Sequence, residues 1–155
     1  MSTNRLLEIE NLNTTFHIHV GQVQAVRGIS LHVDHGEAVG IVGESGSGKS
    51  VSMLSLMRLL PDYAHISADR IYFEGQDLTN ASVDQVRRLS GDRIGMVFQD
   101  PMTSLNPLMT IGRQMQETLR VHRKMRRAAA ARRVRELLEL VDIPDPDSRQ
   151  KQYPH

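Results

Sequence analysis

Eight consecutive residues carry the strongest chemical signal in the sequence. They fill every fixed position of the pattern G-x-x-x-x-G-K-[ST], in which glycines let several backbone N–H groups turn toward one anion. The lysine of such a loop reaches the outer phosphates, and the hydroxyl that follows it ligates Mg²⁺. The pattern therefore predicts a nucleotide site. Its predicted contacts are Gly43, Glu44, Ser45, Gly46, Ser47, Gly48, Lys49, Ser50 and the adjoining Val51.

The residues on both sides of this loop predict the order strand, loop, helix that a phosphate loop requires. An apolar segment of strand length, residues 38–42, precedes the loop. Apolar residues then recur at helical spacing, which predicts a helix whose N-terminus adds its positive dipole end to the anion site. A glycine and serine turn that matches by chance is the weaker alternative. The helix residues are Val51, Met53, Leu54, Leu56, Met57, Leu59 and Leu60.

Other nucleotide-binding patterns fit less well. A dinucleotide fingerprint counted from Gly46 and Gly48 needs a third glycine where Val51 stands, and a kinase glycine loop fails at the same position. The guanine-specific motif Asn-Lys-x-Asp is absent, because none of the three lysines lies in that context.

Composition narrows the class of protein. The 155 residues suit one domain, and 19 basic against 18 acidic residues give a net charge of +1, which argues against a generally nucleic-acid-binding chain. The absence of cysteine excludes disulfide scaffolds and fits a reducing compartment. The sequence lacks a signal-peptide core and any run approaching the ~20 apolar residues of a membrane span. These features predict a soluble or peripheral protein.

An early strand carries one of the few aromatic residues. Leu6, Ile9 and Leu12, with polar residues between them, predict the start of a strand, and Phe16 follows in a polar setting. Beside a phosphate loop, Phe16 could stack on a nucleotide base, which is worth about 1 to 3 kcal/mol in other base-binding sites. A phenylalanine at a strand end also belongs to many hydrophobic cores, so both roles stay open.

Further strands and a helix are expected around the loop. Alternation over residues 29–33, followed by the turn residues 34–37, predicts a hairpin with residues 38–42. Residues 71–73 predict a strand that enters a tight turn. Residues 83–89 then predict a short amphipathic helix, capped by Ser82 or Asn80.

A second segment could contribute chemistry. Residues 94–98 form an apolar run of strand length that ends in Gln99, Asp100 and Pro101. Asp100 could be the carboxylate that directs Mg²⁺, or Gln99 could contact the metal or the attacking water. A buried strand that meets a turn is the third interpretation, and spacing alone does not rank the three.

The last third of the chain predicts two helices, over residues 108–119 and 128–141, that form a small lobe. Eight basic residues gather there and could meet nucleic acid or lipid headgroups. No aromatic residues interleave them, so a solvated helical face is the favoured interpretation. They are Arg120, Arg123, Lys124, Arg126, Arg127, Arg132, Arg133 and Arg135.

Three stretches together resemble one family. They are GESGSGKS at residues 43–50, MVFQDPMTSLNPL at 96–108 and IPDPDSRQKQYPH at 143–155. They resemble the ATP-binding subunits of ABC transporters, specifically the importers of dipeptides, oligopeptides and, in some members, nickel. The implied fold is α/β, a P-loop NTPase of the ABC type with an antiparallel β subdomain and the start of a helical subdomain. The implied domains are an incomplete ATP-binding core at residues 1–100 and the beginning of the helical subdomain at 101–155.

The resemblance also implies roles for residues and ligands. Gln99 corresponds to the Q-loop glutamine, which touches Mg²⁺ and water and relays movement to the membrane subunits. Lys49 and Gln99 are then the catalytic candidates, and Ser50 and Gln99 the metal ligands. Phe16 is the candidate for the aromatic that stacks on adenine. The implied cofactors are ATP and Mg²⁺.

The implied partners are the transmembrane permease subunits, a second ATP-binding subunit in a homodimer or heterodimer and, indirectly, a solute-binding protein. No nucleic acid partner is expected. The implied location is cytoplasmic, on the inner face of the plasma membrane. The transported solute is not readable from the sequence, because selectivity in such importers lies mainly in the binding protein and permease.

The sequence departs from the family pattern at its end. In this family the segment after Tyr-Pro-His contains the signature motif, a strand ending in Asp-Glu and a switch histidine, whereas this sequence ends at His155. We therefore expect the front half of a larger subunit that binds nucleotide without turnover and is poorly soluble alone. A non-catalytic fragment or regulatory module is the alternative. The similar-looking residues 89–92 lack the second glycine and are interpreted as a helix end.

Overall fold

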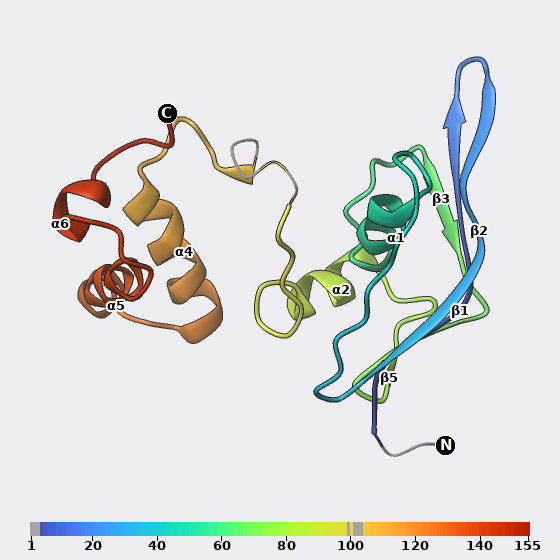
Figure 1. The fold of residues 1–155 in the computed structure, drawn as a ribbon, viewed down its shortest axis with the longest axis horizontal. Coiled ribbons are helices and arrows are strands. Elements are labelled where there is room, and N and C mark those ends of the chain that lie inside the picture. Colours follow the sequence, from blue (N-terminus) through green and yellow to red (C-terminus); the bar gives the residue numbers. More distant parts are fainter. Residues whose placement is uncertain (1–3, 99, 101–103) are drawn as a thin grey trace. The chain divides into compact units, whose positions relative to one another are not determined.

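The computed structural model describes residues 4–98, 100 and 104–155 (Figure 1). The chain divides into two compact units, one ending at Ser90 and the other beginning at Gly91. The first unit contains an antiparallel sheet with helices α1 and α2, and the second contains helices α4, α5 and α6. Because the phosphate loop precedes α1, the first unit positions the candidate site.

A long hairpin organises the first unit. Strand β1 (Arg5–Ile18) pairs antiparallel with β2 (Gly21–Asp34) along its whole length. The other edge of β1 pairs with two short strands in succession, β3 (Ala64–Ser67) and β4 (Arg70–Phe73). Strand β5 (Gln76–Asp77) completes the order β2-β1-β4-β5. Figure 1 shows the hairpin as the tallest element of this unit, with α1 beside it.

Apolar residues of these strands build the hydrophobic core. Ile9 and Leu12 of β1 are almost completely buried, and Ile9 pairs with Ile71 of β4. Ile9 and Leu12 are three residues apart, and the strand register shifts between them, where Asn11 has a φ of 52°. The helices α1 (Lys49–Leu56) and α2 (Val83–Leu89) contribute the buried Leu56 and Val86 to the same unit.

Two predicted features near β4 are confirmed. The strand over residues 71–73 lies within β4, and the tight turn that follows has positive φ angles at Glu74 (49°) and Gly75 (77°). Such angles suit a two-residue hairpin turn with the twist of its strands. Helix α2 begins after Ser82, whose hydroxyl accepts from the Gln85 N–H while the Gln85 side chain accepts from the Ser82 N–H. This reciprocal cap fixes the start of α2.

The predicted hairpin between residues 29–33 and 38–42 is wrong. Residues 29–33 pair with β1 instead, for example Ile29 with Leu12 and Leu31 with Ile9. Residues 38–42 form no strand with any part of the chain that the structure describes, and Val42 is 97% exposed. A parallel core strand is buried on both faces and needs neighbours on both edges, and its own sequence cannot supply them.

The second unit is helical, as predicted, with shifted boundaries. Helix α4 (Ile111–Arg123) starts after the cap Thr110, and α5 (Arg127–Leu140) and α6 (Pro146–Arg149) follow. Ala130, Val134 and Leu138 bury one face of α5. The predicted strand over residues 94–98 is not formed within the described residues. Its Val97 is 96% exposed, which has the same cause as at residues 38–42.

The predicted helix end at residues 89–92 is confirmed, because α2 ends at Leu89 and Ser90 is its C-terminal cap. In the part of the chain that is described, no helix has both the length and the apolar character needed to cross a bilayer.

The turn after β5 predicts a measurable titration. The Thr79 side chain and N–H donate to the Asp77 carboxylate, the N–H to Oδ1 at 2.8 Å, and these bonds lower the pKa of Asp77. The ionised group therefore stabilises the turn above its unfolded pKa, and this contribution is lost as the pH falls through the lower folded value. Carbon NMR of the Asp77 carboxyl is expected to show a pKa below the ordinary value of an aspartate. A pKa at or above the ordinary aspartate value contradicts the hydrogen bonds.

Candidate functional site

The phosphate-loop residues form a loop that the lysine closes. The Lys49 Nζ donates to the carbonyl oxygens of Gly43 at 2.6 Å and Glu44 at 2.7 Å. It also lies 3.2 Å from the Ser47 Oγ. The backbone reverses through Gly46, whose φ of +80° is unfavourable for residues with a side chain. The structure thus brings Lys49 together with Gly43, Glu44 and Ser47, and their predicted contacts with phosphate stay a prediction.

The loop leads directly into the N-terminus of α1. Gly48 is the N-cap residue, with φ +90°, and no side chain caps the helix. The first-turn N–H groups and the positive end of the helix dipole favour an anion in front of the helix. Ser50 is exposed, and its hydroxyl bonds to no other described residue. A polyphosphate with a hard cation fits this combination of donors and free hydroxyl.

Gly48 lies against the β1–β2 hairpin. A Cβ on Gly48 would be only 2.5 Å from the carbonyl oxygen of Ala25 in β2. The strand register shifts at this point, because Thr14 pairs with Val26 while Thr15 pairs with Gln24, leaving Ala25 between them. Such bulges re-aim the backbone next to functional sites. Glycine is therefore required at this position for close approach as well as for its φ angle.

The buried face of α1 carries serines. Ser52 and Ser55 are 4% and 0% exposed, and their hydroxyls donate to the carbonyls of Gly48 (2.9 Å) and Val51 (2.6 Å). The Ser55 Oγ is also 2.8 Å from the Thr14 Oγ1 of β1. The predicted helix is confirmed but ends at Leu56. Small hydroxyl side chains let it pack closely on the hairpin.

Phe16 lies on β1, two residues beyond Thr14. Its ring is 6.0 Å from the Tyr63 ring, with the planes at 52°. The ring is half-buried rather than enclosed in the core. Part of the Phe16 ring is therefore accessible, on the strand against which α1 packs. The predicted stacking of Phe16 on adenine stays a prediction.

Gln99 lies outside the described residues, so its predicted contact with Mg²⁺ stays a prediction. Its neighbour Asp100 is exposed. Among the described residues there is no group of three or more His, Cys, Asp or Glu side chains that could hold a metal ion. The assignment of Ser50 and Gln99 as Mg²⁺ ligands therefore stays a prediction.

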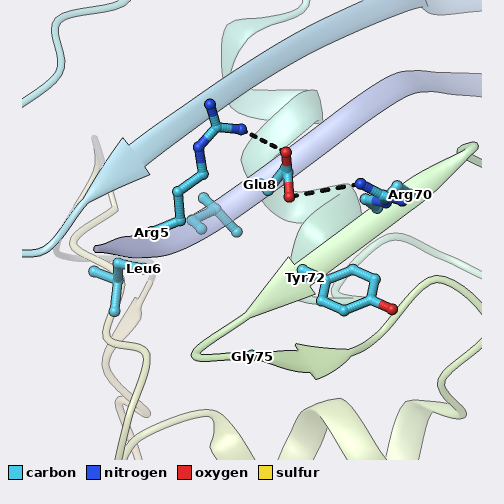
Figure 2. Close-up of a pocket in the computed structure, with 7 residues that line it drawn as sticks. Arg5, Leu6, Glu8, Arg70, Tyr72 and Gly75 are labelled. Carbon is cyan, nitrogen blue, oxygen red and sulfur yellow. Dashed lines mark hydrogen bonds and ion pairs between the residues drawn. The ribbon is translucent and has the colours of Figure 1, made fainter. Parts of the chain in front are cut away.

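A separate hollow of about 370 Å³ lies at the start of β1, beside β4 (Figure 2). Figure 2 shows Glu8 between Arg5 and Arg70, with an ion pair to each. Arg70 also lies 3.6 Å from Glu10 and 5.4 Å from the centre of the Tyr72 ring. Two carboxylates thus balance the two arginines. The hollow offers no uncompensated charge for a polyphosphate, unlike the loop before α1.

Sequence reasoning missed the residues that support the site. Thr14, Ala25 and Ser55 hold α1 against the hairpin, yet none belongs to the phosphate-loop pattern. The available signal was Ser52 and Ser55, three residues apart among the apolar residues 51–56. Their spacing places both hydroxyls on one face.

Comparisons with known proteins place the chain in one family. The model of the ABC transporter family matches residues 26–155. The chain is 49% identical over 152 residues to the oligopeptide transport ATP-binding protein OppD of Bacillus subtilis (strain 168), covering 97% of this chain and 42% of that protein. It is 45% identical over 150 residues to the dipeptide transport ATP-binding protein DppD of Escherichia coli (strain K12), covering 97% and 46%. The chain thus spans less than half the length of these relatives.

A solved structure shares the fold. It is a dimeric, post-hydrolysis state of the ATP-binding cassette MJ0796 bound to ADP and Pi. The TM-score is 0.78 at 22% identity, over 96% of this chain and 61% of that chain. The similarity extends to the antiparallel sheet and the helices, and it confirms the predicted fold class.

Proposed function

Because the chain belongs to the ABC transporter family, we propose that it is the nucleotide-binding part of the ATP-binding subunit of a peptide importer. The complete subunit hydrolyses ATP and couples this reaction to the uptake of dipeptides or oligopeptides. The peptide class is supported by the names of the relatives, which are oligopeptide and dipeptide transport ATP-binding proteins.

The observation that carries this proposal is the loop before α1. It combines backbone N–H groups, the N-terminus of α1, which no side chain caps, and the ammonium of Lys49 within a few residues. A polyphosphate replaces the Gly43 and Glu44 carbonyls as the partner of Lys49. The ammonium then offsets the charge that hydrolysis moves onto the phosphates.

Mg²⁺ fits the same donor set. The free Ser50 hydroxyl is a hard oxygen ligand, and Gln99 is the second proposed ligand. The ion offsets negative charge on the phosphate oxygens when it is bound. Residues 43–51 bind the phosphates, and Phe16 stacks on adenine.

The proposed assembly follows the family. Two ATP-binding subunits, alike or different, associate with transmembrane permease subunits at the inner face of the plasma membrane, and a solute-binding protein delivers the peptide. Residues 1–100 belong to the ATP-binding core and residues 101–155 to the helical part of the subunit.

Calorimetric titration of the purified chain with Mg²⁺-ATP tests the proposal. We expect saturable binding of ATP and much weaker binding of AMP, because AMP lacks the outer phosphates that Lys49 contacts. Measurement of phosphate release from the same sample tests the expectation that these 155 residues bind ATP without hydrolysing it. Equal affinity for ATP and AMP contradicts the proposed phosphate site, and steady hydrolysis contradicts a purely binding role.

Replacement of Phe16 by alanine tests the base contact. We expect ATP binding to weaken by about 1 to 3 kcal/mol, because the stacking surface is lost. Inorganic tripolyphosphate has no base, so its affinity should not change. Tyr63→Phe is the matched control, because it keeps the ring that packs against Phe16. Equal losses for ATP and tripolyphosphate remove Phe16 from the base site.

A further inference from the structure

We propose that the buried hydroxyl pair of Thr14 and Ser55 positions the nucleotide site by fixing the spacing between the adenine platform on β1 and the phosphate loop before α1. The inference rests on the proposed function and assigns a positioning role to two residues outside the nucleotide-binding pattern. It predicts how well a single ATP molecule can contact the Phe16 ring and the phosphate loop at the same time.

The direction of the hydrogen bonds follows from the proton count. Ser55 has one hydroxyl proton, and it is donated to the Val51 carbonyl at 2.6 Å. Thr14 must therefore donate its own proton to the Ser55 Oγ across 2.8 Å. Both side chains are 0% exposed, so water does not compete for either group. The result is a directed chain from β1 through Ser55 into the backbone of α1.

The pair joins the two parts that must cooperate. Thr14 and Phe16 are two residues apart on β1, so their side chains share one face of the strand. Burial agrees, because their β3 partners Ile66 and Ala64 are half-buried whereas the intervening His65 is exposed. Ser55 belongs to the helix that begins at the phosphate loop. A shift of α1 along β1 therefore changes the separation of Phe16 and Lys49.

A second contact fixes the other end of α1. Gly48 lies against the Ala25 carbonyl at the bulge of β2, and Ala25 adjoins Val26, which pairs with Thr14. One contact alone allows the helix to pivot, whereas two define its position along the hairpin. Apolar contacts tolerate sliding, but a hydrogen bond weakens steeply with distance and angle. The hydroxyl pair is thus the contact that sets the position of α1 along β1, and with it the distance from Phe16 to the phosphate loop.

The proposed positioning role predicts different effects on the affinities for ATP and for inorganic tripolyphosphate. ATP must contact the Phe16 ring and the phosphate loop together, so it is sensitive to their spacing. Inorganic tripolyphosphate contacts only the loop, so it is not. Loss of the hydroxyl pair should therefore reduce ATP affinity selectively, whereas a general structural defect reduces both affinities.

The test measures dissociation constants of Mg²⁺-ATP and Mg²⁺-tripolyphosphate for the full chain and its variants. Thr14→Val keeps the shape and removes the hydroxyl, and Thr14→Ser keeps the hydroxyl. We expect Thr14→Val to raise the dissociation constant for ATP about tenfold, equivalent to one net hydrogen bond of about 1.4 kcal/mol. Tripolyphosphate binding should be unchanged, and Thr14→Ser should restore ATP binding. Thr15→Val is the matched control, because Thr15 lies on the other face of β1.

Further outcomes separate this inference from the proposed function. Ser55→Ala should reproduce Thr14→Val, and the double variant should be no weaker than either single variant, because one bond is lost in each case. Parallel losses for both ligands, or no loss for ATP, overturn the positioning role. Wild-type protein that binds neither ligand overturns the proposed function itself. Tripolyphosphate binding by each variant also reports that its loop is folded.

Discussion

Lys49→Ala is expected to weaken binding of a triphosphate by about 1.5 to 3 kcal/mol, the range for hydrogen bonds that involve a charged group. This corresponds to about a 10- to 150-fold increase in the dissociation constant. The ammonium closes the loop through Gly43 and Glu44 at 2.6 and 2.7 Å, so the variant loses both the phosphate contact and the closure of the empty loop. Calorimetry with ATP and with tripolyphosphate measures the effect.

Lys151→Ala is the matched control, since Lys151 is exposed and its side chain forms no hydrogen bond or ion pair with another described residue. It removes the same charge from the chain without changing the loop. Equal affinities of wild type and Lys49→Ala for both ligands exclude Lys49 from the phosphate site. Equal losses in the two lysine variants indicate that net charge, rather than contact, determines binding.

Gly48→Ala is expected to lower the free energy of unfolding by about 2 to 5 kcal/mol, the sum of the left-handed backbone strain and an overpacked contact. The new Cβ meets the Ala25 carbonyl at 2.5 Å, and a backbone oxygen cannot rotate away as a side chain can. Relief requires that α1 move off the hairpin. Urea denaturation measures the stability, and tripolyphosphate titration measures the accompanying loss of phosphate binding.

Gly46→Ala provides the comparison at a nearby glycine. Gly46 also has a positive φ, of +80°, but nothing lies within 4 Å of its added Cβ. It should therefore lose only about 1 to 2 kcal/mol from backbone strain. Similar stability of the two variants contradicts the close approach of Gly48 to β2.

Local chemistry made the phosphate loop predictable from sequence. Glycine, lysine and serine at fixed spacing favour a particular backbone geometry, and the structure forms the predicted loop before α1, with Lys49 donating to the Gly43 and Glu44 carbonyls; the predicted phosphate contacts stay a prediction. The Ser82 cap and the turn at Glu74 and Gly75 were predictable for the same reason. In each case the controlling contacts lie within a few residues.

Strands depend on partners that a single segment does not encode. Residues 38–42 and 94–98 have the composition of buried strands, but neither pairs in a sheet within the described residues. The hairpin of β1 and β2 arose instead, because residues 29–33 alternate in a register that matches β1. Hydrophobic pattern alone does not choose between two acceptable neighbours.

The contacts that hold α1 against the hairpin were equally unpredictable from the sequence. Thr14 and Ser55 are 41 residues apart, and only the folded chain shows that their hydroxyls meet. Helical periodicity drew attention to Val51, Met53 and Leu54, yet these are half-exposed while the serines are buried. The sequence-derived roles of Phe16 and Gln99, and the division of the domains at residue 100, stay predictions.

Residues 38–42 are exposed and pair with no strand in the described part of the chain, and this has a practical consequence. Exposed segments outside helices and sheets are the preferred sites of proteolytic cleavage. Limited digestion should therefore nick the chain between β2 and the phosphate loop. The two pieces should then elute together under native conditions. Thr14 and Ala25 of the hairpin still contact Ser55 and Gly48 of the other piece after the peptide bond between them is cut.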